Sequence, residues 1–236
     1  ASKITLEKIS NKLGLPLAPT HLEQTKAFSL KDKNILTNQI LVLKITNKKD
    51  FEALLAYQPR LIIEDTQINS TFDLNPTLQT GSGFCVSLST KTAYYANLAP
   101  YIYRMMMQRG FFYKDPNCLI TLLHEIIANG LIHGNMGIHT TDQKSLKNLE
   151  MISHQINAAL KNPDITNKHL SLHFTEKGKD YLFSVRDQGT WPKSEKTTIK
   201  EPLIRGLSFL KKYAHSYTID KEINKVSFSL KHLSRL

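Results

Sequence analysis

One stretch of the sequence, residues 115–138, limits the fold of this chain more than any other. Its leucines and isoleucines recur at helical spacing and form one apolar stripe, made of Leu119, Leu122, Leu123, Ile126 and Ile127. Asp115 followed by Pro116 is typical of a helix start, because aspartate can cap the first turn and proline suits the first helical position. The stretch therefore predicts an amphipathic helix that packs its apolar stripe against a core.

The opposite side of this predicted helix carries a row of polar side chains. Glu125, Asn129 and His133 are spaced four residues apart, which places a carboxylate, an amide and an imidazole along one face. A solvated polar face is the simpler interpretation of such a row. The small residues that follow, at 134–137, favour a ligand site instead, since glycines let a backbone approach a ligand closely.

Residues 124–138 resemble the N-box of the GHKL ATP-binding fold, which gyrase, Hsp90, histidine kinases and anti-sigma-factor kinases share. The likeness is closest to the anti-sigma branch and to kinase-like output modules of bacterial regulators. It implies that Asn129 holds the Mg²⁺ ion of a bound nucleotide, that Glu125 is a general base and that His133 belongs to the nucleotide site. These residue types suit the chemistry, because Mg²⁺ prefers oxygen ligands and a carboxylate accepts a proton from an attacking hydroxyl.

A second motif lies about fifty residues further along the chain. Alternating segments at residues 170–175 and 181–186 predict a β-hairpin, and the second segment leads into an Asp-Gln-Gly turn. Alone, this tripeptide is typical of a plain turn. Here it resembles the G1 box of the same family, which implies that Asp187 accepts a hydrogen bond from the adenine amine and that Gly189 lets the backbone pass beneath the ring. Trp191 stands where the family commonly has a further glycine.

Residues 190–205 correspond in this resemblance to the lid over the nucleotide phosphates. Its basic side chains either belong to a solvated loop or complement a triphosphate, and Arg205 is the residue for which we favour a phosphate contact. The second glycine box of the family is reduced to Gly206, with Ile204 in place of the other glycine, and a β-branched residue does not readily take a positive φ. Ser208, predicted to begin the next helix, offers a hydroxyl to a phosphate.

The pattern of residues 83–236 predicts an α/β fold of the two-layer, α+β sandwich type. Four further elements are expected: strands at residues 84–89 and 225–230, and helices at residues 94–108 and 144–161, the last closed by Pro163. We expect a mixed β-sheet covered on one face by helices, with the nucleotide between the helix at 115–138 and the lid.

Residues 1–80 are predicted to form a smaller α/β segment, separated from the rest by a turn-rich linker. Its expected order is strand, helix and strand, at residues 39–45, 50–57 and 60–64. Residues 58–65 resemble the middle of a response-regulator receiver domain, in which Asp65 would be the phosphoacceptor, although the acidic pair of such domains is missing. Asp65 is therefore interpreted as a strand-end residue. A degenerate or truncated receiver and an unrelated docking domain both stay open.

Composition narrows the choice of partner. The chain has 31 Lys and Arg against 20 Asp and Glu, a net charge of +11, which favours nucleotides, nucleic acid or an acidic protein. Lysine is spread along the chain without a basic block or aromatic ladder, which argues against specific nucleic-acid binding. No apolar run has the roughly 20 residues of a membrane span, so we expect a cytoplasmic protein. Cys85 and Cys118 are interpreted as small buried hydrophobes in a reducing compartment.

We therefore expect an ATP-binding regulator that resembles an anti-sigma-factor serine/threonine kinase. With ATP and Mg²⁺ it would transfer the γ-phosphate to a partner protein in bacterial signalling, a sigma factor or an anti-anti-sigma-like regulator. The alternative is a non-catalytic pseudo-kinase that uses the same fold to bind a protein. Glu125 and Asn129 favour the kinase, whereas Trp191 and Ile204 favour the alternative. A basic nucleic-acid-binding domain is a third hypothesis, and formation of a homodimer stays open.

Overall fold

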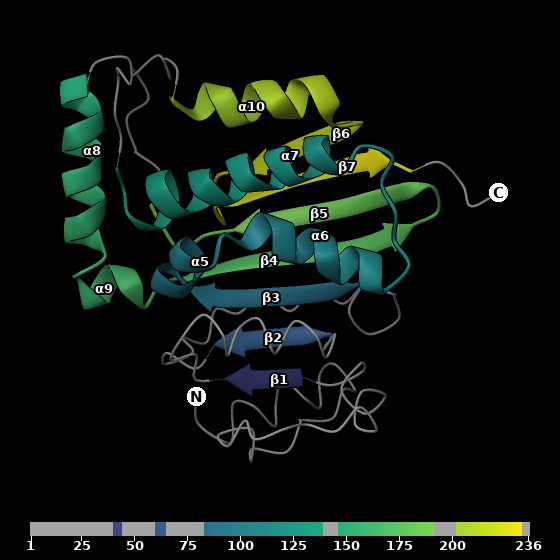
Figure 1. Ribbon diagram of the computed structural model, residues 1–236, viewed down its shortest axis with the longest axis horizontal. Coiled ribbons are helices and arrows are strands. Elements are labelled where there is room, and N and C mark those ends of the chain that lie inside the picture. Colours follow the sequence, from purple (N-terminus) through teal and green to yellow (C-terminus); the bar gives the residue numbers. More distant parts are fainter. Residues whose placement is uncertain (1–39, 44–59, 65–82, 139–145, 191–201, 233–236) are drawn as a thin grey trace.

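A single mixed sheet runs through the part of the chain that the computed structural model describes, which is residues 40–43, 60–64, 83–138, 146–190 and 202–232. Seven strands lie in the order β1-β2-β3-β4-β5-β7-β6 (Figure 1). They are β1 Ile40–Leu43, β2 Leu61–Glu64, β3 Phe84–Ser89, β4 His169–Lys177, β5 Asp180–Arg186, β6 Ser216–Asp220 and β7 Lys225–Lys231. β1, β2 and β3 pair in parallel, and all later pairs are antiparallel.

Helices cover one face of this sheet. The described helices are α5 Thr90–Ala96, α6 Leu98–Gln108, α7 Pro116–Asn129, the π-helix η3 Gly130–Asn135, α8 Leu146–Ala159, α9 Pro163–Thr166 and α10 Pro202–Tyr213. Figure 1 shows α5, α6, α7 and α10 in front of the strands, with α8 and α9 at one end of them. The predicted α/β arrangement, a mixed sheet with a layer of helices, is confirmed.

The hydrophobic core lies between the sheet and the helices. Strand residues alternate between the two faces, so Phe174 and Phe183 point toward the helices while Ser184 points away. The ring centroid of Phe174 lies 5.2, 5.1 and 5.0 Å from those of Phe84, Phe111 and Phe183. Burial of each such ring contributes about 1.5–3 kcal/mol, so this aromatic cluster is a main source of the stability of the fold.

The strands predicted at residues 39–45 and 60–64 are confirmed as β1 and β2. They pair in parallel, as strands of a βαβ unit do, and β2 pairs in parallel with β3. One continuous sheet therefore joins the two sides of the boundary predicted near residue 80. The helix predicted at residues 50–57, the linker and Asp65 lie outside the described residues, and the division into two domains stays a prediction.

The single helix expected at residues 94–108 is wrong, because two helices, α5 and α6, lie there. Ser89 begins α5 earlier than predicted, since its side chain accepts a hydrogen bond from Thr92 N–H (3.1 Å) and caps the helix. The buried carboxylate of Glu64 holds the same turn by accepting hydrogen bonds from Ser89 N–H and the Thr92 hydroxyl, both at 2.7 Å. Asn97 then takes a left-handed conformation (φ 49°), which asparagine tolerates and which separates α5 from α6.

The boundary between the predicted lid and the helix after it is also wrong. α10 begins at Pro202, so three residues assigned to the second glycine box lie within a helix: Ile204, Arg205 and Gly206. Ser208, expected to begin this helix, lies in its interior. Proline favours the first helical position, because its fixed φ suits that position and its missing N–H would have no helical partner there. Residues 191–201, with Trp191, lie outside the described residues.

The helix predicted at residues 144–161 is confirmed as α8, but Pro163 does not close it. Pro163 begins the short helix α9, which Asn162 caps by accepting a hydrogen bond from Asp164 N–H (3.0 Å). β6 was not predicted from the sequence. Among the described strands it pairs only with β7, at the edge of the sheet, and its residues are exposed or half-buried, so its apolar pattern is weak.

The other strand predictions are confirmed. Residues 84–89 form β3, residues 225–230 belong to β7, and the hairpin is formed by β4 and β5. Both strands of the hairpin are longer than predicted, so that only two residues connect them. Gly178 is one of these and takes a positive φ of 63°, as two-residue hairpin turns require.

Two remaining predictions have mixed outcomes. In the described part of the chain, no helix has the length and apolar character needed to cross a membrane. Both cysteines are free thiols, but only Cys85 is buried; Cys118, in the first turn of α7, is half-buried. The interpretation as a small buried hydrophobe is therefore confirmed for Cys85 and not for Cys118.

Candidate functional site

The amphipathic helix predicted from residue 115 is α7. Asp115 caps it by accepting a hydrogen bond from Cys118 N–H (3.0 Å), and Pro116 occupies the first helical position. Five residues of the apolar stripe are buried: Leu119, Leu122, Leu123, Ile126 and Ile127. The polar side is half-buried at Glu125 and Asn129, and Asn129 is the last residue of the α-helical part. Both side chains are thus positioned on the side of α7 away from the core.

The helix ends within the glycine-containing segment 134–137, where the sequence predicts its end, and its last part is the π-helix η3, which reaches Asn135. Met136 N–H donates to the carbonyl of Leu131 (2.9 Å), a bond that spans five residues. Because a π-turn holds one residue more than an α-turn, the side chains after Asn129 leave the row that the α-helix would give them. Insertions of this kind are frequent at functional sites because they redirect side chains.

His133 is one of the redirected side chains. Its Nδ1 lies 2.6 Å from the carbonyl oxygen of Ile138. A carbonyl only accepts hydrogen bonds, so Nδ1 carries the proton and donates it. This contact closes the turn in which Gly137 takes a positive φ of 65°. His133 therefore stabilises the end of the helix, and its contribution to a nucleotide site stays a prediction.

The two sequence motifs meet where η3 contacts residues 187–189, which we call the helix–loop junction. A Cβ atom on Gly134 would overlap the Asp187 carboxylate, and one on Gly189 would overlap the backbone of Gly134. A Cβ on Gly130 would lie 3.8 Å from Asp187 Cβ, so the residue after Asn129 is also close to this loop. Both Gly134 and Gly189 must therefore be glycine, because backbone and carboxylate pass each other without room for a side chain.

Asp187 is the residue of the junction whose pKa is shifted most clearly. Burial raises its pKa to about 6, against the opposing effects of the Gly189 N–H hydrogen bond (2.8 Å) and the positive charges of Lys168 and Arg186. A raised pKa means that the lost hydration of the carboxylate is not fully replaced by donors of the protein. The ionised carboxylate is therefore a strong acceptor for a donor that a ligand would bring.

Sequence reasoning missed the residue with the most hydrogen bonds at the junction, Asn135. Only 1% of Asn135 is exposed. Its Oδ1 accepts from Gln188 N–H (2.7 Å), and its Nδ2 donates to Thr90 Oγ1 (2.8 Å) and to the His169 carbonyl (3.2 Å). The only sequence signal was an asparagine between the glycines that end the helix. Its partners lie on β4, on α5 and beyond β5, so local sequence does not reveal them.

The other predicted site residues lie on α10. This helix packs alongside α7, and the side chain of Ser208 is exposed. For Arg205 and Gly206 the structure describes the backbone only, within the second turn of α10. The structure thus joins α7 and the Asp187 loop, and places the backbone of the predicted phosphate-binding residues on the neighbouring helix.

The potential metal ligands of the site suit a metal ion that arrives with a nucleotide better than a metal ion held by the protein alone. Among the described residues, no group of three or more His, Cys, Asp and Glu could hold a metal ion. Mg²⁺ bound with a nucleotide takes most of its ligands from phosphates and water and needs only one or two protein oxygens. The amide oxygen of Asn129, half-buried at the end of α7, fits that requirement.

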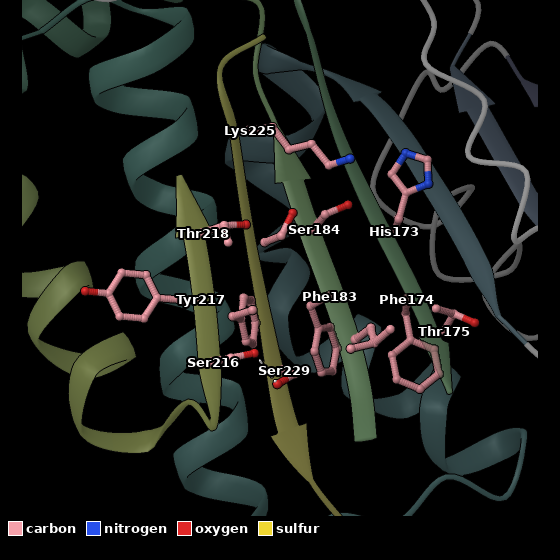
Figure 2. Close-up of a pocket in the computed structure, with 13 residues that line it drawn as sticks. His173, Phe174, Thr175, Phe183, Ser184, Ser216, Tyr217, Thr218, Lys225 and Ser229 are labelled. Atoms are coloured by element: carbon pink, nitrogen blue, oxygen red, sulfur yellow. Dashed lines mark hydrogen bonds between the residues drawn. The ribbon is translucent and has the colours of Figure 1, made fainter. Parts of the chain in front are cut away.

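A second concave feature lies on the opposite face of the sheet. It is a depression of ≈ 240 Å³ across β4, β5, β7 and β6 (Figure 2). Nearly half of its lining residues carry short hydroxyl side chains: Thr175, Ser184, Ser216, Thr218, Ser227 and Ser229. His173 and Lys225 lie at its upper end in Figure 2. None of its lining residues belongs to the helix–loop junction, so the two features are separate.

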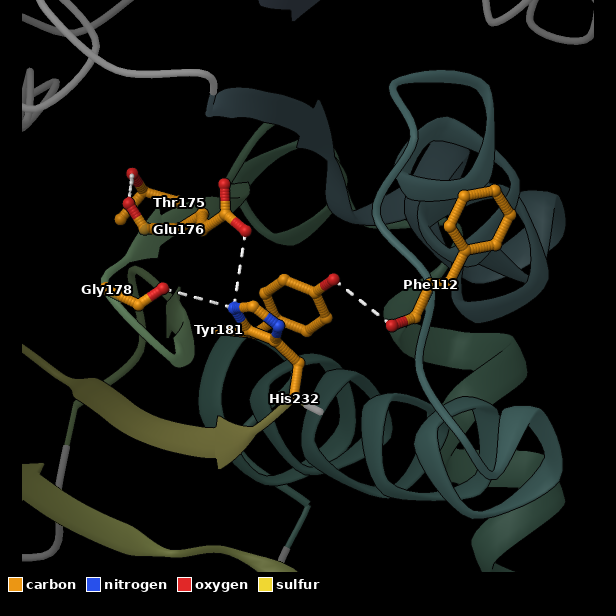
Figure 3. Close-up of polar contacts among 6 residues, drawn as sticks. All are labelled: Phe112, Thr175, Glu176, Gly178, Tyr181 and His232. Atoms are coloured by element: carbon orange, nitrogen blue, oxygen red, sulfur yellow. Dashed lines mark hydrogen bonds and ion pairs between the residues drawn. The ribbon is translucent and has the colours of Figure 1, made fainter. Parts of the chain in front are cut away.

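A third polar cluster lies at the end of β5 remote from Asp187. The Tyr181 hydroxyl donates to the carbonyl of Phe112 (3.1 Å), and the His232 ring stacks on Tyr181 with centroids 4.4 Å apart (Figure 3). His232 Nε2 lies 3.3 Å from a carboxylate oxygen of Glu176 and 3.2 Å from the Gly178 carbonyl. These contacts tie the end of β7 to the hairpin turn, which is a structural role.

No protein-family model matches this chain, and no curated protein matches it either. The resemblance to the GHKL fold therefore depends on the residues quoted above and on their geometry.

Proposed function

We propose that this protein is an ATP-binding regulator of the GHKL type, which transfers the γ-phosphate of ATP to a hydroxyl group of a partner protein. The observation that carries the proposal is the helix–loop junction. It places a desolvated carboxylate, Asp187, against Gly134, at the end of the helical segment that carries Glu125 and Asn129. The two motifs are about fifty residues apart in sequence, and a nucleotide site requires that they meet.

Each residue has a role that its chemistry supports. Asp187 accepts a hydrogen bond from the exocyclic amine of adenine, and Gly189 keeps the loop close to the helix. Asn129 supplies an oxygen ligand to the Mg²⁺ that accompanies the phosphates, and the metal neutralises their charge. Glu125, one turn before Asn129, takes the proton from the attacking hydroxyl of the partner.

The partner in this proposal is a regulatory protein in the cytoplasm, of the sigma-factor or anti-anti-sigma-like kind. The net charge of +11 supports an acidic partner surface and attraction of the nucleotide. Binding of nucleic acid is a weaker hypothesis, because lysine is spread along the chain without a basic block. It would predict affinity for DNA that falls steeply with salt and does not depend on nucleotide.

A non-catalytic pseudo-kinase is the second candidate, and the start of α10 favours it. Because Ile204, Arg205 and Gly206 lie within this helix, they do not form the glycine loop that wraps phosphates in the resembled family. The Glu125→Gln variant distinguishes the candidates. In a kinase it binds Mg-ATP as the intact protein does but transfers phosphate about 10²–10⁴ times more slowly; in a pseudo-kinase neither protein transfers phosphate.

Calorimetry of ATP and ADP binding, with and without Mg²⁺, tests the proposed function. We expect micromolar, Mg²⁺-dependent binding that is lost in Asn129→Ala and in Asp187→Asn. Asn157→Ala and Asp164→Asn are matched controls, because they make the same changes at exposed positions of α8 and α9. Absence of nucleotide binding in the intact protein would overturn the proposal.

A further inference from the structure

We propose that Asn135 is a positioning residue of the nucleotide site, which holds the Asp187 loop against the helix and thereby sets the preference for adenine. The inference rests on the proposed function for its nucleotide. Its structural basis is independent of any ligand, because it consists of hydrogen bonds within the protein.

The loop at residues 187–189 is held from two sides. From the helix side, Asn135 Oδ1 accepts the hydrogen bond of Gln188 N–H at 2.7 Å. From the β6–β7 turn, the carbonyl of Asn224 accepts from Asp187 N–H at 3.1 Å, and the Asn224 side-chain amide donates to the Gly189 carbonyl. Each of the three loop residues thus has a main-chain group bound to an asparagine.

The side chain of Gln188 adds a second contact to the helix side. Its Oε1 accepts a hydrogen bond from His169 N–H at 2.8 Å, and the carbonyl of the same His169 accepts from Asn135 Nδ2 at 3.2 Å. Asn135, Gln188 and the first residue of β4 therefore form a closed ring of hydrogen bonds. A closed ring resists displacement, because no member moves without breaking two bonds.

Only an asparagine satisfies this position. The same side chain must accept from Gln188 N–H and donate to the His169 carbonyl and to Thr90 Oγ1. Thr90 donates its own hydroxyl proton to the Lys168 carbonyl (2.9 Å), so its oxygen needs a donor from Asn135. An aspartate would place an acceptor opposite the His169 carbonyl. An alanine would remove the acceptor of Gln188 N–H and the donor to the His169 carbonyl and to Thr90 Oγ1.

Asn135 affects the nucleotide site through the position of the Asp187 carboxylate. Its carboxylate lies between Gly134 and the loop, so a shift of the loop moves the acceptor relative to α7. Adenine carries an amine where hypoxanthine carries a carbonyl, and only the amine donates a hydrogen bond to Asp187. Displacement of the loop should therefore weaken ATP binding more than ITP binding, a change in selectivity that a general loss of stability would not cause.

The test measures dissociation constants of Mg-ATP and Mg-ITP for the full chain and four variants. Asn135→Ala and Thr90→Val remove the contacts, Thr90→Ser keeps the hydroxyl, and Leu230→Ala is a control that destabilises the core far from the site. We expect Asn135→Ala and Thr90→Val to reduce the ATP/ITP preference roughly tenfold, while Thr90→Ser and Leu230→Ala keep it. An unchanged preference in Asn135→Ala would overturn the inference.

A ligand-free measurement separates this inference from the proposed function. Amide hydrogen exchange at Gln188 and Gly189 should become faster in Asn135→Ala than in Leu230→Ala, when both are compared at equal global stability. If the intact protein binds neither nucleotide, the proposed function and the selectivity role are both overturned. If exchange is equal in the two variants, Asn135 does not hold the loop, whatever the protein binds.

Discussion

The helix–loop junction and the outer face of the sheet are both rich in polar side chains, but these side chains find their hydrogen-bond partners in different ways. On the outer face, short side chains pair across strands: Ser216 Oγ lies 2.8 Å from Ser229 Oγ, and Ser87 Oγ lies 3.0 Å from Ser171 Oγ. At the junction, burial raises the pKa of Asp187 to about 6. Hydroxyl pairs exchange hydrogen bonds within the protein, whereas a desolvated carboxylate gains from a donor that a ligand supplies.

The difference shows why a depression in a surface is not by itself a site. The outer depression has a volume of ≈ 240 Å³, and its lining combines small hydroxyl side chains with aromatic ones. The junction is tightly packed, with glycines where a carboxylate and two backbones converge. Convergence of elements that are distant in sequence, together with a carboxylate whose lost hydration is only partly replaced, is the stronger indicator of function.

The largest effect that sharpens this comparison is expected from Gly134→Ala. The added methyl group would overlap the Asp187 carboxylate and force the loop away from η3, which should lower the free energy of unfolding by about 3 kcal/mol. Urea denaturation measures this change. Gly178→Ala is the control, because that glycine has a positive φ but no atom within 4 Å of the added carbon, and it should cost only about 1 kcal/mol. Equal losses would show that the junction is not tightly packed.

Asp187→Asn should stabilise the ligand-free protein while it removes nucleotide binding. The pKa of Asp187 is raised from 3.8 to about 6, so the ionised side chain destabilises the folded state above pH 6, and this cost disappears as the pH falls toward 4. We expect the variant to gain about 2 kcal/mol at pH 8 and nothing at pH 4. Denaturation at the two pH values, with Asp164→Asn beside it, tests this. A gain at both pH values would contradict the electrostatic explanation.

The third effect is the pH dependence of nucleotide affinity. Protonation of Asp187 replaces a strong anionic acceptor with a weaker neutral one, so the affinity for Mg-ATP should fall up to about tenfold per pH unit below pH 6. Phosphate groups of the nucleotide also titrate in this range. Mg-ITP lacks the amine from which Asp187 accepts a hydrogen bond, so its pH profile reports that background, and only the difference between the Mg-ATP and Mg-ITP profiles belongs to Asp187. Parallel profiles would exclude Asp187 as the titrating group.

The smallest effect is expected on the outer face. Ser229→Ala removes one hydroxyl of the Ser216–Ser229 pair and should cost about 1 kcal/mol or less, because Ser216 is exposed and binds water instead. Mg-ATP affinity should not change. Thermal unfolding and calorimetry of the same sample measure both quantities. A marked loss of Mg-ATP affinity would contradict this comparison, since it would show that the outer face contributes to nucleotide binding.

Much of the fold was predictable because its signals are local. The apolar stripe of α7, the cap at Asp115 and the alternation along β4 and β5 each occupy one short segment, and propensity and burial favour the same structure there. Predictions failed where one residue or the edge of the sheet changed the outcome. Asn97 divides α5 from α6 by taking a left-handed conformation, and β6 forms through pairing with β7 despite its weak apolar pattern.

In the candidate site, too, local patterns were predictable from the sequence and tertiary contacts were not. Local patterns in the sequence singled out Glu125 and Asn129 on one helix face and Asp187 in a turn after a strand, and the resemblance to the GHKL fold supplied the roles predicted for them. Tertiary structure alone decided that η3 continues α7, that Gly134 meets the Asp187 carboxylate and that Asn135 binds Gln188. The physical reason is that desolvation and hydrogen bonding depend on which segments come into contact, and folding brings together groups that the sequence separates by 53 residues.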